Sequence, residues 1–188
     1  NIVLYNPHGW AFNMNNISVI KKKVYALIEK VLAYKTNMII AISAWEKESA
    51  IKYKICCSDK IHIIPSGVDV CLYDEERGRY DLNRSKLKIP LNAYIIGMVG
   101  RISYGKGPDL FIKAAALIKE KIPNAFFVIV GDGEERASVE NLLSEMRLKD
   151  DFLITGWVSN PIEYIQLFDQ AMLLTRWEGF GLVLTEYM

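Results

Sequence analysis

Three segments rich in glycine and charge hold the residues whose types and spacing suit recognition of a charged ligand. The first, residues 100–107, reads GRISYGKG and carries two cations, Arg101 and Lys106, just before a predicted helix. Helix amides and the helix dipole attract anions, so this segment predicts a diphosphate site. A P-loop needs Ser or Thr after its lysine to hold magnesium. Gly107 occupies that position and disfavours a P-loop. The alternative is two surface cations beside a turn.

The second segment, residues 131–135, reads GDGEE and predicts a tight turn from a strand into a helix. It fails as a dinucleotide-binding fingerprint because Arg136 stands where the last glycine is required. Acidic residues at the start of a helix stabilise the helix but repel a pyrophosphate. A purely structural turn is therefore the favoured interpretation.

The third segment, residues 176–186, reads RWEGFGLVLTE and combines two glycines with two carboxylates. Gly179 and Gly181 let the backbone approach a ligand closely, and their amides precede a predicted helix. Glu178 and Glu186 could accept hydrogen bonds from separate sugar rings of one ligand. The alternative is a capping Glu178 and a solvated Glu186.

The elements that position these segments follow from the alternation of apolar runs with helical patterns. We predict strands over residues 2–5, 38–42, 60–64, 94–99, 125–130, 152–155 and 171–174. We predict helices over residues 17–34, 44–53, 107–121, 134–147 and 161–168, and another from residue 181 onward. Strands that alternate with helices indicate an α/β fold with parallel sheets. Ligands bind at the carboxyl ends of such strands, where the three segments lie.

Two further features concern the organisation of the chain. Residues 65–90 contain two prolines, two glycines and charged runs, which predicts a linker and a domain boundary. The helix over residues 17–34 has an apolar stripe, with Lys21–Lys23 and Lys30 mostly off it. A basic amphipathic helix can dock on an anionic lipid surface, and an ordinary surface helix is the alternative. The apolar stripe consists of Ile20, Val24, Leu27, Ile28, Val31 and Leu32.

Composition excludes several classes of protein. The 188 residues have a formal net charge of +1 and 51% hydrophobic residues, which excludes a disordered tail and a polybasic nucleic-acid arm. A membrane-spanning helix would need about 20 consecutive apolar residues, more than any run here. Three cysteines form neither an even disulfide set nor a paired metal-ligand spacing. No export signal opens the chain, so we expect a cytoplasmic location. Both ends fall inside predicted elements, so we expect a fragment of a longer protein.

The motifs together resemble the family-4 retaining glycosyltransferases of the GT-B fold, of the bacterial polysaccharide type. EGFG opens an E-x7-E pattern at residues 178–186, and GR…KG spans residues 100–107. The other matching stretches are VGDG at 130–133, G-x-V at 156–158, SGVD at 66–69 and HGW-x-F at 8–12. Two departures are Ser66, where the family usually has Asn, and residues 174–177, where many members begin with Pro-Ser. The matches run through nearly the whole chain.

This resemblance implies two Rossmann-like domains that face each other across a cleft, both incomplete here. Residues 1–70 would be the C-terminal part of the acceptor-side domain. Residues 71–188 would be the linker and the first part of the nucleotide-sugar-binding domain. The implied catalytic residues are His8, beside the anomeric centre, and Glu178, facing the transferred sugar. A structural role is the alternative for His8.

The resemblance also implies a set of nucleotide-sugar contacts. Arg101 and Lys106 would hold the diphosphate, and Glu186 would accept hydrogen bonds from the ribose. The remaining contacts would be the backbone around Trp157 and Val158, near the base, and Gly179, Phe180 and Gly181, near the sugar and phosphate.

The implied activity is transfer of a sugar from a UDP-, GDP- or ADP-sugar to a hydroxyl of a sugar or lipid-linked saccharide, with retention at the anomeric carbon. No metal, cofactor or nucleic acid is expected to take part. Contact with the inner face of an anionic membrane, through the Lys21–Lys23 helix, is the further expectation. The alternatives are a non-catalytic module that binds a nucleotide sugar and a sugar-nucleotide epimerase of the same fold.

Overall fold

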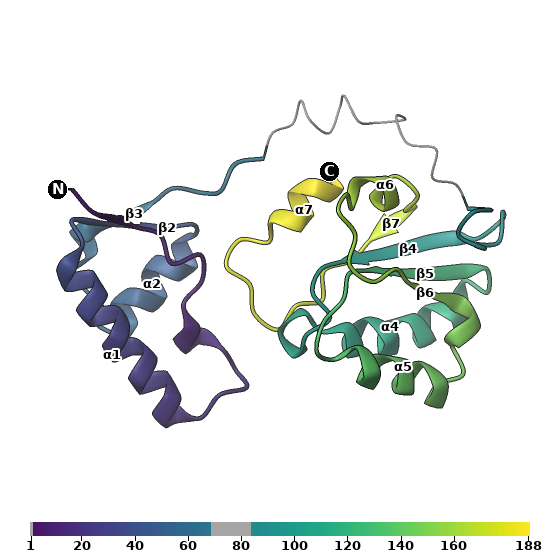
Figure 1. Ribbon diagram of the computed structural model, residues 1–188, viewed down its shortest axis with the longest axis horizontal. Coiled ribbons are helices and arrows are strands. Elements are labelled where there is room, and N and C mark those ends of the chain that lie inside the picture. Colours follow the sequence, from purple (N-terminus) through teal and green to yellow (C-terminus); the bar gives the residue numbers. More distant parts are fainter. Residues whose placement is uncertain (1, 69–83) are drawn as a thin grey trace. The chain divides into compact units, whose positions relative to one another are not determined.

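The computed structural model describes residues 2–68 and 84–188 and divides the chain into two compact units (Figure 1). Unit 1 comprises Asn1–Gly67 and Trp177–Leu182, and unit 2 comprises Val68–Arg176 and Val183–Met188. The boundary predicted between residues 70 and 71 lies outside the described residues. Residues 177–182 group with unit 1 although they follow the strands of unit 2 in the chain.

Unit 1 is built on a three-stranded parallel sheet with the order β1-β2-β3. The strands are β1 (Leu4–Tyr5), β2 (Met38–Ala41) and β3 (Ile61–Ile63). The helices are α1 (Val19–Lys35) and α2 (Ala44–Lys52), with short 3-10 turns at Ala11–Asn13 and Ser58–Lys60. Each α-helix begins at a serine cap, since the hydroxyls of Ser18 and Ser43 accept hydrogen bonds from the amides three residues later.

The core of unit 1 anchors the segment that follows His8. The Trp10 and Phe12 rings stack with centroids 5.4 Å apart, and the Phe12 and Tyr53 rings lie 4.4 Å apart. The Trp10 indole Nε1 donates a 2.9 Å hydrogen bond to the Glu46 backbone carbonyl. The loop that carries His8 is therefore fixed at its far end by buried aromatic side chains.

Helix α1 packs in an unexpected way for its sequence. Its buried residues are Ala26 and Ala33. Every member of its apolar stripe is exposed, from 42% for Leu32 to 75% for Ile20. The period of the sequence thus identified the apolar face of the helix, but nothing among the described residues covers that face.

Unit 2 contains a four-stranded parallel sheet with the order β6-β5-β4-β7. The strands are β4 (Tyr94–Val99), β5 (Ala125–Val130), β6 (Phe152–Ile154) and β7 (Gln170–Ala171). The helices are α4 (Pro108–Lys121), α5 (Arg136–Glu145), α6 (Ile162–Ile165) and α7 (Leu182–Tyr187), with 3-10 turns at Tyr104–Lys106 and Lys149–Asp151. Helices α4 and α5 cover one face of the sheet and α6 lies on the other (Figure 1). The parallel sheets confirm the predicted α/β fold class.

The two faces of the sheet have separate cores. Phe127 and Ile129 of β5 pack with Phe111 of α4 on one face, while Phe126 and Val128 pack on the other. Strand β5 is buried at all six positions, as expected for a strand covered on both sides. Burial of each such side chain contributes about 1.5–3 kcal/mol. This two-sided burial holds the strands that position the loops at their carboxyl ends.

The predicted element boundaries agree with the structure at β4 and β5 and differ most after residue 160. The helix predicted over 161–168 spans Ile162–Ile165, and the strand predicted over 171–174 spans Gln170–Ala171. The Asp169 carboxylate accepts a 2.7 Å hydrogen bond from the Ile95 amide. The side chain of Asp169, the residue before β7, thus accepts a hydrogen bond from a backbone amide of β4.

Candidate functional site

The loops at the carboxyl edge of the unit 2 sheet are joined by backbone hydrogen bonds. The Ile102 amide donates to the Asp132 carbonyl at 2.9 Å, and the Glu135 amide donates to the Ile102 carbonyl at 3.0 Å. Gly131 and Gly156 form an isolated bridge. The loops that follow β4, β5 and β6 therefore form one connected frame, at the edge where parallel sheets bind ligands.

Two glycines make this frame possible. Gly131 has φ +144°, and a Cβ there would lie 2.1 Å from the Gly100 carbonyl oxygen. Gly107 has φ +67°, and its Cβ would lie 2.2 Å from the Leu174 carbonyl oxygen. A side chain at either position would collide with backbone, so glycine is required for the loops to approach this closely.

Arg101 and Lys106, the predicted diphosphate ligands, lie on the loop after β4. The Arg101 Nε donates a 2.9 Å hydrogen bond to Glu134 Oε2, and both side chains are exposed. A hydrogen bond from its own backbone amide, followed by Arg101, holds the pKa of the Glu134 carboxyl below its usual value. Lys106 is half-buried. The acidic turn thus supplies the partner of Arg101, a role beyond that of the structural turn predicted from the sequence.

Arg176 ties the loop after β7 to the loop after β4. Its backbone amide donates to the Gly105 carbonyl at 2.8 Å, and its guanidinium donates to both Asp109 carboxylate oxygens at 2.8 and 2.7 Å. The guanidinium carbon lies 4.2 Å from the centroid of the Tyr104 ring. The Arg176 hydrogen bonds are the main reason that the pKa of Asp109 lies below its usual value. Arg176 is not among the residues predicted from the sequence, and its only signal was its place in residues 174–177, where many members of the resembled family begin with Pro-Ser.

Tyr187 attaches α7 to the end of β4. Its hydroxyl oxygen accepts a 2.8 Å hydrogen bond from the Val99 amide, one residue before Gly100. Burial raises the pKa of Tyr187 to about 12. Glu186, the predicted ribose ligand, is the adjacent residue and is half-buried. The helix that carries Glu186 is therefore fixed beside the start of the predicted diphosphate loop.

The two residues predicted near the base differ in exposure. Trp157 is 79% exposed, whereas Val158 is half-buried and packs against the core on the α6 side of the sheet. Trp157 thus offers an open aromatic face and Val158 contributes to packing.

In unit 1, His8 lies in the loop after β1 and Glu46 lies in the first turn of α2. The two side chains are close enough to interact electrostatically. His8 is exposed with φ +48°, and its amide donates to Asn6 Oδ1 at 3.1 Å. Glu46 is fully buried, and its Oε2 accepts a 3.0 Å hydrogen bond from the Ile42 amide. Burial raises the pKa of Glu46, while the Ile42 hydrogen bond and His8 act in the opposite direction. Glu46 is not among the residues predicted from the sequence, where its only signal is the capping pattern Ser43-x-x-Glu46.

The EGFG segment, residues 178–181, groups with unit 1. The Gly179 amide donates a 3.2 Å hydrogen bond to Glu178 Oε1. A Cβ at Gly179 would lie 2.9 Å from Glu46 Oε1, so glycine fits this position through close packing. Phe180 is half-buried, and Gly181 is buried with φ +82°.

The predicted site residues are thus divided between the two units. Unit 2 holds Arg101, Lys106, Trp157, Val158 and Glu186, and unit 1 holds His8, Glu178, Gly179, Phe180 and Gly181. Across residues 2–68 and 84–188, no three His, Cys, Asp or Glu side chains are grouped as metal ligands would be. No helix in these same ranges has the length and apolarity that crossing a membrane requires.

Comparisons with known proteins match this architecture. Residues 80–188 match the family described as "Glycosyl transferases group 1". The UDP-Gal:alpha-D-GlcNAc-diphosphoundecaprenol alpha-1,3-galactosyltransferase of Escherichia coli is 33% identical over 98% of this chain and 48% of its own length. The crystal structure of Anabaena Alr3699/HepE in complex with UDP and glucose has a TM-score of 0.83 at 19% identity, over 99% of this chain and 50% of that one.

A second solved structure gives the same result. WaaG, a glycosyltransferase involved in lipopolysaccharide biosynthesis, has a TM-score of 0.81 at 19% identity, over 100% of this chain and 54% of that one. The chain spans about half the length of the relatives it matches. With two parallel α/β sheets and a family match over residues 80–188, this chain belongs to the group 1 glycosyltransferases and has the GT-B fold.

Proposed function

We propose that this chain carries the donor-binding residues of a retaining glycosyltransferase that acts in bacterial surface polysaccharide synthesis. The observation that supports this most is the carboxyl edge of the unit 2 sheet. There, Arg101 and Lys106 lie on a loop that backbone hydrogen bonds hold to its neighbours. Two cations on a preorganised loop suit a diphosphate, the group that leaves in sugar transfer.

The proposed reaction breaks the bond between the anomeric carbon and the diphosphate oxygen and forms a bond from that carbon to the acceptor oxygen. The acceptor proton passes to the departing diphosphate, and attack on the same face retains the anomeric configuration. Negative charge grows on the diphosphate as the bond breaks. Fixed cations such as Arg101 and Lys106 stabilise such charge by several kcal/mol without a metal ion.

The proposed roles of the other residues follow from the motifs they occupy. Glu178 and His8 act at the transferred sugar, with Glu178 providing carboxylate density rather than a covalent nucleophile. Glu186 accepts hydrogen bonds from the ribose, and the backbone around Trp157 and Val158 lies beside the base. Gly179, Phe180 and Gly181 present backbone amides to the sugar and phosphate.

We propose a UDP-sugar as donor and a lipid-linked saccharide as acceptor. The HepE crystal structure contains UDP and glucose. The name of the Escherichia coli relative specifies UDP-Gal as donor and a GlcNAc linked through a diphosphate to undecaprenol as acceptor. GDP- and ADP-sugars are the alternative donors.

We also propose that α1 contacts the inner face of an anionic membrane. Its apolar stripe is exposed, and Lys21, Lys23 and Lys30 are exposed on the same helix. Apolar side chains that enter the acyl boundary and lysines that meet anionic headgroups form the pattern of an interfacial helix. Such contact would bring the enzyme to a lipid-linked acceptor.

The function is tested with Lys106→Ala in the complete protein, assayed with UDP-, GDP- and ADP-sugars in buffer containing EDTA. We expect an about 100-fold lower turnover than wild type, comparable to loss of one transition-state donor. The matched control is Lys121→Ala, an exposed lysine at the end of α4.

The same assay separates the alternatives. Wild-type turnover by Lys106→Ala would refute the assignment of this lysine. Donor binding without transfer would identify a non-catalytic module, and an epimerised nucleotide sugar in the absence of acceptor would identify an epimerase. Inversion at the anomeric carbon, read by NMR of the product, would contradict retention.

A further inference from the structure

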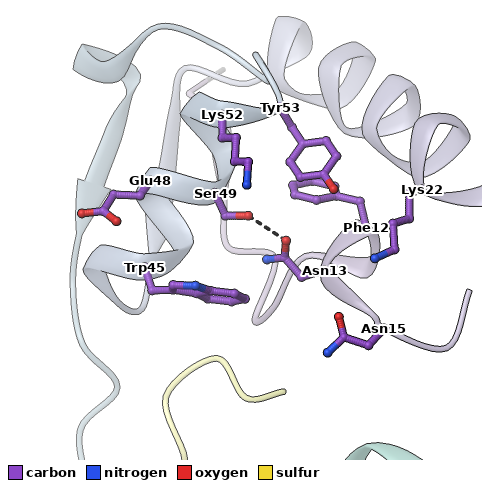
Figure 2. A pocket seen from close by; sticks show the side chains of 9 residues that line it. All are labelled: Phe12, Asn13, Asn15, Lys22, Trp45, Glu48, Ser49, Lys52 and Tyr53. Carbon is purple, nitrogen blue, oxygen red and sulfur yellow. Dashed lines mark hydrogen bonds between the residues drawn. The ribbon is translucent and has the colours of Figure 1, made fainter. Parts of the chain in front are cut away.

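A pocket of about 340 Å³ lies in unit 1 beside the segment that follows the HGW motif (Figure 2). The 3-10 turn at Ala11–Asn13, the start of α1 and one face of α2 form its walls. None of the residues assigned to donor binding lines it. The side chains that matter for its chemistry are Asn13, Lys22, Trp45, Ser49 and Lys52.

Asn13 is held in the wall with an unused hydrogen-bond donor. The Ser49 hydroxyl donates to Asn13 Oδ1 at 2.7 Å, which fixes the orientation of the amide (Figure 2). The amide nitrogen Nδ2 is buried and has no hydrogen-bond partner in the described part of the chain. A buried donor without a partner is unfavourable, so a ligand oxygen that accepts its hydrogen bond would stabilise the bound complex.

Two cations border the same space. Lys22 extends from α1 and Lys52 from α2, and their ammonium groups both point toward the pocket (Figure 2). Neither lysine forms an ion pair within residues 2–68 and 84–188. Glu48 also lines the pocket, but Figure 2 shows its carboxylate pointing away from both lysines. The pocket interior is therefore positively charged and suits an anionic group.

An aromatic surface completes the pocket. Trp45 is 49% exposed, and its ring lies along one side of the space (Figure 2). The half-buried Tyr53 ring, which packs on Phe12, lines another side of the pocket. A flat apolar face next to hydrogen-bonding groups is the arrangement that binds a sugar ring, which has both apolar C–H faces and hydroxyls.

We propose that this pocket binds the phosphorylated saccharide of the acceptor. The phosphate lies between Lys22 and Lys52, the sugar ring packs on Trp45, and a sugar oxygen accepts a hydrogen bond from Asn13 Nδ2. This inference rests on the proposed function, because a saccharide linked through a diphosphate is the acceptor proposed above.

The test is isothermal titration of the complete protein with three probes, α-D-GlcNAc 1-phosphate, GlcNAc and inorganic phosphate. We expect the sugar phosphate to bind at least about tenfold more tightly than GlcNAc or inorganic phosphate alone. It contacts both the lysines and the Trp45 ring, whereas each smaller probe contacts only one of them. Lys52→Gln and Trp45→Leu should each weaken it about tenfold. The controls are Lys54→Gln and Tyr34→Leu, which are both exposed in unit 1 and outside the pocket.

A kinetic measurement on the same variants separates this proposal from the proposed function. We expect the acceptor KM to rise while the donor KM is unchanged. Transfer with an unaltered acceptor KM in both pocket variants would overturn the pocket and leave the function intact. Equal binding of the sugar phosphate and inorganic phosphate, or of the sugar phosphate and GlcNAc, would also overturn it. Tight sugar-phosphate binding that both variants weaken, in a protein without transfer activity, would instead refute the function.

Discussion

The Arg176 guanidinium binds both carboxylate oxygens of Asp109, 67 residues earlier in the chain, at 2.8 and 2.7 Å. The same side chain donates to the Tyr104 carbonyl at 2.8 Å. These bonds connect the first turn of α4 to the segment that leads into the EGFG motif. The loop with the predicted diphosphate ligands and the loop after β7 are thus fixed to each other.

Arg176→Lys should destabilise the protein by about 1–2 kcal/mol, because lysine cannot form two parallel hydrogen bonds to one carboxylate. The matched control is Lys113→Gln, since the exposed Lys113 ammonium also faces Asp109, at 3.7 Å. Its loss should cost less than about 0.5 kcal/mol. Urea denaturation measures both changes. Equal effects of the two substitutions would contradict the importance of the bidentate pair.

Asp109 should also make stability depend on pH in the acidic range. Its pKa is lowered in the folded protein, so its stabilising effect is present above the ordinary Asp value of about 3.9. The effect is lost as pH falls through the lower folded value. The stability gap between wild type and Asp109→Asn should therefore be constant above about pH 5 and shrink below about pH 4.

Urea denaturation at several pH values measures this gap. The control is Glu134→Gln, because the pKa of Glu134 is also lowered but its side chain is exposed to solvent, which screens the interaction. We expect that variant to show little pH-dependent difference from wild type. A gap for Asp109→Asn that grows with acidification would reverse the assigned sign.

Gly107→Ala should disrupt the loop frame. Its φ of +67° disfavours a side chain, and the new Cβ would collide with the Leu174 carbonyl. We expect a loss of about 2 kcal/mol or more, together with weaker donor binding. Gly67→Ala is the control, since nothing lies within 4 Å of a Cβ there. Thermal unfolding with and without UDP measures both effects, and similar melting temperatures for the two variants would refute the steric argument.

Tyr187→Phe tests the attachment of α7 to β4. The Val99 amide would lose its hydrogen-bond acceptor, at an expected cost of about 1 kcal/mol. Tyr164→Phe is the control, because the Tyr164 hydroxyl forms no hydrogen bond within residues 2–68 and 84–188. Hydrogen exchange at the Val99 amide should accelerate only in Tyr187→Phe. Unchanged protection of that amide would show that the hydroxyl does not hold the helix.

Membrane contact by α1 is tested by vesicle co-sedimentation of the complete protein. Lys21→Glu with Lys23→Glu should abolish most binding to vesicles that contain anionic lipid, at about 1 kcal/mol per lysine removed. The control pair is Lys121→Glu with Lys149→Glu, two exposed lysines of unit 2. Unchanged binding of the α1 variant would defeat the proposal.

The sequence predicts much of the fold because periodicity and glycine placement are local signals. Strands β4 and β5 span the predicted residues, and the glycines at 107 and 131 mark the loops they were expected to form. The family resemblance rested on the same local motifs, and the match over residues 80–188 confirms it.

What the sequence could not predict are pairings between residues far apart in the chain. Tyr187 and Val99 are separated by 88 positions, and no local pattern connects them. Glu134 suggested only a helix start, whereas it pairs with Arg101, 33 residues away. The burial of Glu46 could not be predicted either. Its capping pattern is common in helices, and its burial depends on tertiary packing.

The close approaches at Gly131 and Gly107 place main chain directly against main chain, so this part of the scaffold does not depend on the exposed side chains that project from it. An exposed residue such as Trp157 can therefore be exchanged without displacing the main chain beneath it. Altered ligand choice in such a protein can arise by replacing protruding side chains one at a time, while the underlying architecture stays constant.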